Sequence, residues 1–273
     1  MNKKSAALLS KAEAYTKELS DHIVLRSYWD KLSLVLKGST ARGNADRYSD
    51  IDFVFFTDSD TIGKIISGYR HHGMIQRSDG IFVPLRDWEG HYNFESFDKL
   101  AGYFSKPDYP EIWEYQNVHI MHDPAGMYAS LISSLSKDLL AQPLDAIKAK
   151  YLSINLNLDW LRHPLMRGDN VGVILHTVKV IQELCQICYL MDGKCYPHDK
   201  WLFPYIGTTR FGRSNKSQIE DYAACIADRN EKHLELESYK QFSDGYALLI
   251  KIAAFINRHY GPQPWLDEWY LFV

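Results

Sequence analysis

Hydrophobic and polar positions follow one pattern in the first part of the chain and another in the second. Apolar residues recur at helical spacing from about residue 5 to residue 19, which predicts an opening helix. Strand-length apolar runs then occupy residues 32–36, 51–56, 81–85, 91–97 and 118–121. A helical segment at about residues 61–69 separates the second run from the third. This first part therefore predicts a mixed domain of strands and helices.

Strand signals end near residue 124, and only helical spacing continues from there. Prolines and glycines divide this part into helical segments, expected at about residues 124–138, 144–161, 170–191, 198–205, 216–228 and 233–259. Their apolar stripes predict an antiparallel bundle. The expected fold class is α+β, with a mixed-sheet domain at residues 1–123 and an all-α helical bundle domain at residues 124–273.

Two aspartates stand where the second predicted strand begins, in the segment Asp50-Ile51-Asp52. Because successive side chains on a strand point to opposite faces, Asp50 and Asp52 are expected side by side on one face. Two such carboxylates repel each other, and a hard divalent cation such as Mg²⁺ relieves that repulsion. The pair therefore predicts a metal site.

A polar loop, residues 38–49, precedes the aspartates. Gly38 lets backbone N–H groups approach a ligand closely, and Ser39 adds a hydroxyl. Arg42 offers a planar fork that matches phosphate oxygens. The loop thus predicts phosphate donors next to a metal platform.

The segments GSTARG and SDIDFVFF resemble the nucleotidyltransferase superfamily with the DNA polymerase beta-type fold. Its signature is Gly-Ser, a spacer, and Asp-x-Asp between apolar residues. The likeness is closest to the branch of aminoglycoside and lincosamide nucleotidyltransferases, in which a small catalytic domain precedes a helical one. The resemblance implies nucleotide-binding roles for Gly38, Ser39, Arg42 and Ser49. It implies catalytic and metal-binding roles for Asp50 and Asp52.

The resemblance also implies a third acidic residue on a later strand. Glu95 is the candidate for completing the catalytic and metal-binding set, and Asp98 is the alternative. A glutamate in an apolar strand is unfavourable unless it is charge-paired, which favours a functional role. In the helical part, Lys200 precedes a Trp-Leu pair as in similar helical domains, and it is the candidate for neutralising the triphosphate of a bound nucleotide.

Composition limits the partners. A formal net charge of −3 argues against wrapping nucleic acid by bulk electrostatics, so a nucleotide and a small molecule fit better. The apolar run near the N-terminus is short for a signal peptide, and no uninterrupted apolar stretch of membrane-spanning length is evident. A cytoplasmic monomer or homodimer without membrane association is expected. Four cysteines are too few for a disulfide framework and are expected to be reduced.

Together with the resemblance, these features predict an Mg²⁺-dependent nucleotidyltransferase that moves an NMP, first of all AMP from ATP, to a hydroxyl of a small acceptor. By the same resemblance the acceptor is an aminoglycoside or lincosamide antibiotic. Two alternatives stay open. One is nucleotidyl transfer to protein or RNA, as in toxin and antitoxin pairs, and the other is a nucleotide-binding module without turnover.

Overall fold

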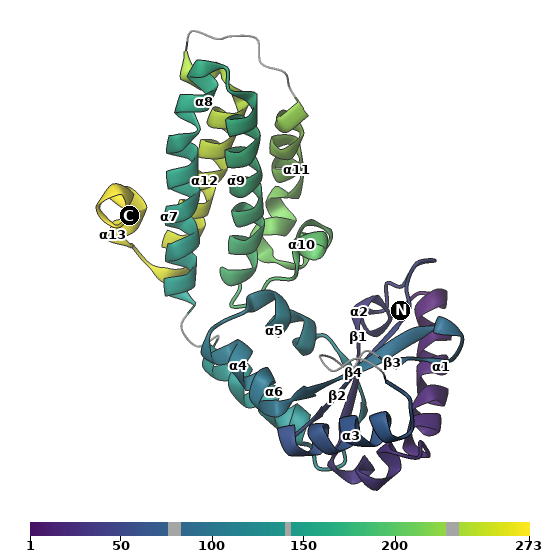
Figure 1. Ribbon diagram of the computed structural model, residues 1–273. Coiled ribbons are helices and arrows are strands. Elements are labelled where there is room, and N and C mark those ends of the chain that lie inside the picture. Colours follow the sequence, from purple (N-terminus) through teal and green to yellow (C-terminus); the bar gives the residue numbers. More distant parts are fainter. Residues whose placement is uncertain (76–82, 140–142, 228–234) are drawn as a thin grey trace. The chain divides into compact units, whose positions relative to one another are not determined.

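The computed structural model describes residues 1–75, 83–139, 143–227 and 235–273, and it contains two compact units (Figure 1). The first unit is Met1–Leu139 and the second is Leu140–Val273. The expected boundary at residue 123/124 differs from this division by one helix, α6 (Met127–Leu139). Tyr128 of α6 explains the difference, because its ring lies 5.1 Å from that of Phe56 and its hydroxyl donates to the Tyr115 carbonyl.

The first unit is built on a mixed sheet, whose order among the described residues is β3-β4-β2-β1-β5. Its strands are β1 (Ser33–Lys37), β2 (Ile51–Thr57), β3 (Val83–Pro84), β4 (Gly90–Ser96) and β5 (His119–His122). β4 runs parallel to β2, whereas the other neighbouring pairs are antiparallel. Each expected strand is present, although the run expected at 81–85 lies partly outside the described residues. The α+β class is confirmed.

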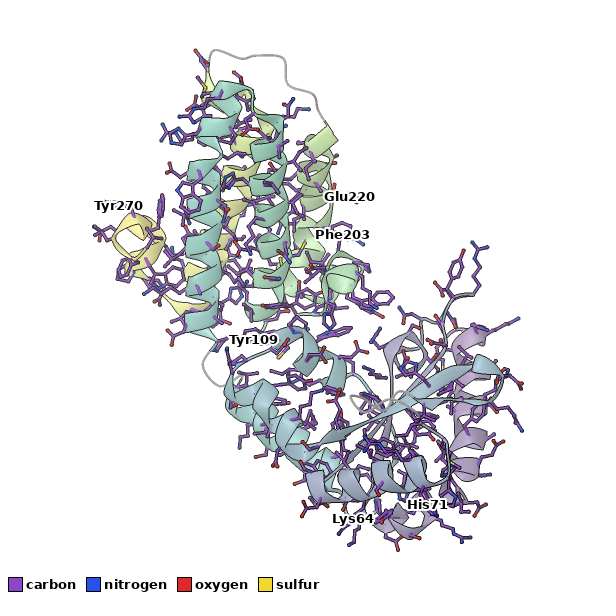
Figure 2. All side chains as sticks on the ribbon, in the orientation of Figure 1. Lys64, His71, Tyr109, Phe203, Glu220 and Tyr270 are labelled. Atoms are coloured by element: carbon purple, nitrogen blue, oxygen red, sulfur yellow. The ribbon has the colours of Figure 1, made fainter. Side chains whose placement is uncertain are left out.

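Helices α1 (Lys3–Ser20) and α3 (Ser59–His71) cover one face of the sheet. Each begins at a side-chain cap: Asn2 accepts from the Ser5 N–H, and Asp58 accepts from the Thr61 N–H, both at 2.8 Å. The buried core on this face includes Leu8, Ala12, Leu34, Leu36, Phe53, Phe55, Ile65 and Tyr69. Lys64 and His71 lie on the outer, exposed side of α3 (Figure 2).

Helices α4 (Phe97–Ser105), α5 (Tyr109–Gln116) and α6 pack on the opposite face, at the end of β2. Phe56 points to that face, and its ring centroid lies between 5.1 and 6.1 Å from those of Phe97, Tyr115 and Tyr128. Asp52 points to the same face at the beginning of β2, where a quarter of its side chain (25%) is exposed. The aromatic cluster therefore leaves the beginning of β2 accessible. Short 3₁₀ helices also occur at Leu25–Ser27, Trp29–Lys31 and Arg86–Trp88.

The second unit is a helical bundle. Its α-helices are α7 (Leu144–Trp160), α8 (Arg162–Arg167), α9 (Asn170–Leu190), α10 (Asp199–Tyr205), α11 (Arg210–Ala224), α12 (Lys240–Tyr260) and α13 (Pro264–Asp267). Its 3₁₀ helices are Ile206–Thr208, Cys225–Ala227, Leu236–Ser238 and Trp269–Leu271. α9 is central, since α7, α8, α10 and α11 all contact it.

α9 is apolar along much of its length, but Lys179 and Glu183 interrupt it, so the expectation that no uninterrupted apolar stretch spans a membrane is unchanged. By length and composition alone the helix is long and apolar enough to cross a bilayer, with a mean hydropathy of 1.3 over its most apolar window. Half of that window is buried inside the unit. The core helix of a bundle has the same properties, so the helix is weak support for membrane insertion.

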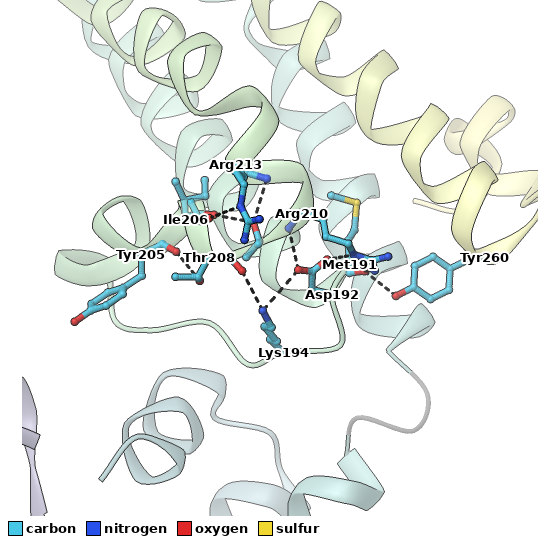
Figure 3. Close-up of polar contacts among 12 residues, drawn as sticks. Met191, Asp192, Lys194, Tyr205, Ile206, Thr208, Arg210, Arg213 and Tyr260 are labelled. Atoms are coloured by element: carbon cyan, nitrogen blue, oxygen red, sulfur yellow. Dashed lines mark hydrogen bonds and ion pairs between the residues drawn. The ribbon is translucent and has the colours of Figure 1, made fainter. Parts of the chain in front are cut away.

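A polar junction fastens the end of α9 to two other helices (Figure 3). The Asp192 carboxylate accepts from the backbone N–H of Arg210 at 2.9 Å and from its Nε at 2.8 Å. Lys194 Nζ lies 3.7 Å from the same carboxylate. The Met191 carbonyl accepts from the Tyr260 hydroxyl at 3.0 Å. The end of α9 is thus held to the start of α11 and the end of α12.

All four cysteines of the chain are buried free thiols. Burial raises the pKa of Cys185 and of Cys195 to about 12, so little thiolate forms at neutral pH. We expect the native protein to react slowly with an aromatic disulfide reagent and all four thiols to react after denaturation in guanidinium. Rapid reaction of a native thiol would contradict the burial described here.

Candidate active site

Asp50, Asp52 and His91 bring side-chain ligand atoms within 4.8 Å of one another. Asp52 pairs with Lys37 of β1 on one side of β2, and the parallel register places His91 directly opposite it on the other. His91 Nδ1 lies 3.3 Å from Asp52 Oδ1. Within the ranges that the structure describes, this is the one group of three His, Cys, Asp or Glu side chains with such spacing.

Negative charge at Asp52 is incompletely compensated. Burial raises the pKa of its carboxyl, and the nearby Asp50 carboxylate raises it further. His91 and Lys37 act in the opposite direction, and Glu114 adds a smaller upward contribution. The net direction is upward, so a bound cation would relieve the accumulated negative charge. Two carboxylates and an imidazole form a donor set that fits a divalent metal ion.

Gly38 lies against the Asp52 carboxylate. Its φ of +78° is in the left-handed region, and a Cβ built on it would be 2.9 Å from Asp52 Oδ2. The expected close approach of the loop backbone to the aspartates is therefore present. The segment expected as loop begins instead with a short helix, α2 (Gly38–Arg42), which ends at Gly43 in a left-handed conformation.

Side-chain hydrogen bonds close the connection from α2 to β2. Ser39 Oγ donates to Ser49 Oγ at 2.8 Å, and Thr40 Oγ1 donates to the Asp50 carbonyl at 2.9 Å. From α1, the buried Ser5 Oγ accepts from the Ala45 N–H at 2.9 Å. Two of the expected nucleotide ligands, Ser39 and Ser49, are thus brought together next to the aspartates.

Arg42 is held inside the first unit rather than presented to solvent. Its Nη1 donates to Glu114 Oε1 at 2.7 Å, and 5% of its side chain is exposed. Its Cζ lies 5.0 Å from the ring centroid of Trp113. The same Glu114 oxygen accepts the Gly38 N–H at 2.8 Å. α5 therefore engages two donors that were expected to meet phosphate.

Residues 23–96 match the family described as Nucleotidyltransferase domain. The match covers about a quarter of the chain and shows that this segment is similar to a nucleotidyltransferase domain. The matched residues include Gly38, both aspartates and His91, and they end with β4, before Glu114. The family match and the geometry therefore coincide at the beginning of β2.

A similar solved structure is that of a nucleotidyltransferase-like protein from Exiguobacterium sibiricum. Its TM-score is 0.47 at 10% sequence identity, over 96% of this chain and 78% of that one. No curated protein matches the chain. The likeness to the aminoglycoside and lincosamide branch stays a prediction.

Glu95 lies away from Asp50 and Asp52. It stands opposite Phe56, four residues beyond Asp52, which is about 13 Å along the strand. Its buried carboxylate pairs with Lys99 at 3.0 Å. The structure thus contradicts the expectation that Glu95 shares a metal site with Asp52, because the parallel register brings His91 there instead. The alternative, Asp98, is exposed in the first turn of α4 and is not in the cluster either.

Lys200 belongs to the second unit. It is the second residue of α10, it is exposed, and its Nζ lies 5.8 Å from the ring centroid of Trp201. Its expected contact with the triphosphate stays a prediction.

Two residues of the site did not emerge from sequence patterns. His91 is the second residue of β4, and its position beside Asp52 depends on a parallel register that no local pattern encodes. Glu114 lies in an aromatic and acidic segment, 72 residues away from its partner Arg42. A buried arginine requires a carboxylate as its partner. The acidic residues of this segment were therefore candidates for pairing with Arg42.

Proposed function

We propose that this protein is an Mg²⁺-dependent nucleotidyltransferase that moves AMP from ATP to a hydroxyl of a small acceptor. The observation that carries the proposal is the meeting of Asp50, Asp52 and His91 within 4.8 Å, beside the Gly38 backbone, inside a nucleotidyltransferase domain. In the reaction, the acceptor oxygen forms a bond to the α-phosphorus. The bond from that phosphorus to the bridging oxygen breaks, pyrophosphate leaves, and the proton of the acceptor hydroxyl is released to solvent.

Asp50 and Asp52 would hold the metal through oxygen, and His91 would add a nitrogen ligand. A divalent ion bound there would neutralise charge on the triphosphate and on the leaving pyrophosphate. The domain itself contributes positioning. Gly38 keeps the loop backbone close to Asp52, and the bonded hydroxyls of Ser39 and Ser49 offer polar contacts to phosphate oxygens.

Replacement of His91 by alanine tests the composition of the metal set. We expect Mn²⁺, used as a spectroscopic substitute for Mg²⁺, to bind about 10- to 100-fold more weakly, because one of the three donors is lost. His71→Ala on the exposed side of α3 is the matched control and should leave the affinity unchanged. Unchanged Mn²⁺ affinity in His91→Ala would remove the imidazole from the set.

Pyrophosphate release tests the activity itself. The protein is incubated with Mg²⁺, each of the four NTPs and a panel of hydroxylated acceptors that includes aminoglycosides and lincosamides. We expect release that is fastest with ATP, depends on one acceptor class, and stops when EDTA removes the metal. Mass spectrometry of the acceptor should show the addition of one NMP. Labelling of protein or RNA in the same assay, without modification of any small molecule, would point to a macromolecular acceptor.

A nucleotide-binding module without turnover is the second candidate. The position of Glu95 favours it, because no third carboxylate among the described residues joins the two aspartates within 4.8 Å. Thermal stabilisation by Mg-ATP with no pyrophosphate formed against any acceptor would be its signature. We rank the enzyme first, since the partial burial of Asp52 and its repulsion by the neighbouring Asp50 are unfavourable features that catalysis commonly requires.

A further inference from the structure

We infer that Glu114 is a positioning residue of the nucleotidyl site, and that Arg42 acts through Glu114 rather than by contact with the nucleotide. The inference rests on the proposed function and extends it to a residue outside the matched domain. Its starting point is that a single carboxylate oxygen, Glu114 Oε1, accepts both the Gly38 N–H at 2.8 Å and Arg42 Nη1 at 2.7 Å. α5 is thereby linked directly to the loop that carries the Gly-Ser segment.

The pair is too deeply buried to be a surface ion pair. The side chains of Arg42 and Glu114 are 5% and 11% exposed, and Trp113 lies 5.0 Å from the guanidinium carbon. Withdrawal of either partner would leave a buried charge without its counter-ion, which is strongly unfavourable. A nucleotide that recruited Arg42 as a phosphate ligand would impose this penalty each time it bound. A fixed pair avoids it.

The contact reaches the proposed metal site in one step. The N–H of Gly38 donates to Glu114, which fixes the position of the Gly38 backbone. Gly38 also lies so close to Asp52 that a Cβ added to it would be 2.9 Å from Asp52 Oδ2. Glu114 therefore sets how closely the loop backbone approaches a carboxylate that would hold the metal. A shift of about 1 Å in such a group is enough to slow a reaction by about 100-fold.

A double-mutant cycle tests the inference, with Arg42→Met, Glu114→Ala and the double variant. For each protein, the measurements are the Mn²⁺ dissociation constant, kcat and the KM for ATP. We expect each single variant to bind Mn²⁺ about 10-fold more weakly and to lose about 100-fold in kcat, with KM changed less than about 3-fold. The double variant should lie within about 2-fold of either single variant, because both changes remove the same support.

Three further variants separate this role from general destabilisation. Arg86→Met breaks an exposed arginine–glutamate pair with Glu18 in the same unit and should behave as the wild type. Glu114→Gln keeps an oxygen for the Gly38 N–H and should retain intermediate activity. Arg42→Lys keeps the charge but not the fork, and should be intermediate as well. If Glu114→Ala does not fold, the cycle is run with these two conservative variants.

Several results would overturn the inference while leaving the proposed function in place. These are additive losses in the double variant, a rise of more than about 10-fold in the KM for ATP that is confined to the Arg42 variants, and tighter ATP binding in Glu114→Ala. The last result would mean that Glu114 competes with the triphosphate. A wild-type protein that neither binds Mn²⁺ nor releases pyrophosphate would instead overturn the proposed function, and the inference with it.

Discussion

Asp52→Asn is expected to abolish pyrophosphate release and, at the same time, to stabilise the metal-free protein. The activity should fall by about 1,000-fold or more, because one of the two metal-holding carboxylates is lost. The melting temperature should rise, on the order of a few degrees, because the variant removes a partly buried charge that repels Asp50. Gain of stability with loss of function is typical of a site that is held in an unfavourable arrangement.

The pH dependence gives the same prediction a second readout. The pKa of Asp52 is raised in the folded state by burial and then by Asp50. The folded state therefore holds the proton more tightly than the unfolded state. The contribution of Asp52 to stability is full below its ordinary carboxyl pKa and is lost as the pH rises through the raised value. The stability difference between wild type and Asp52→Asn should accordingly widen from acid to neutral pH.

Calorimetric melting between pH 3.5 and 7.5, with EDTA present, measures this difference. Asp60→Asn, on the exposed start of α3, is the matched control for a lost aspartate charge. Full turnover in both Asp50→Asn and Asp52→Asn would refute the proposed mechanism. A lower melting temperature in Asp52→Asn at neutral pH would refute the electrostatic description of the site.

Gly90→Ala is expected to have the largest effect on stability. Gly90 pairs with Ile51 where β4 meets β2, and a Cβ there would be 2.0 Å from the Ile51 carbonyl oxygen. The atoms that the added Cβ would meet belong to the backbone of β2, which cannot rotate away as a flexible side chain can. β2 and β4 must therefore move apart at this point. We expect a loss of more than about 3 kcal/mol in the free energy of unfolding of the first unit. His91, the next residue, should move away from Asp52, and Mn²⁺ binding should fail with it.

Gly63→Ala is the matched control for Gly90→Ala. Gly63 lies within α3 and has nothing within 4 Å of its added Cβ. The substitution should stabilise the protein by about 0.4–1 kcal/mol through the lower entropy of the unfolded chain. Urea unfolding of both variants, followed by circular dichroism, measures the two effects. Equal stability of the two variants would contradict the described pairing of β2 with β4.

The elements of the first unit could be predicted where hydrophobic runs encode them directly. β1 and β2 are apolar along most of their length, and both lie within about one residue of their expected bounds. α1 lies within about two residues of its expected bounds, because its buried positions recur at helical spacing. α2 could not be predicted in this way, since a five-residue helix has too few positions to establish a period. The assignment of α6 to the first unit depends on contacts of Tyr128 that are distant in sequence.

The candidate site was predictable only in part, for a related reason. Asp50, Asp52, Gly38, Ser39 and Ser49 belong to one continuous segment, and the structure brings them together as their spacing indicates. The third member depends on which residue of β4 faces Asp52. The register of β4 on β2 places His91 opposite Asp52 and places Glu95, four residues further on, opposite Phe56. A prediction based only on which residue is acidic selects Glu95 instead.

The residue Arg42 shows the same limit at the level of a single side chain. Its spacing from Gly38 and Ser39 indicates a phosphate ligand, but its surroundings are supplied by α5, which comes much later in the chain. Burial beside Glu114 and Trp113 assigns it a different environment. A motif thus identifies which residues are close together, whereas the charge partners that decide their roles come from the fold.

A crystal structure of the protein with Mn²⁺ and a non-hydrolysable ATP analogue tests the central claim most directly. The account predicts an anomalous manganese peak in contact with the carboxylates of Asp50 and Asp52 and with His91, with the triphosphate next to Gly38 and Ser39. An ordered nucleotide whose manganese lies away from both aspartates would contradict it.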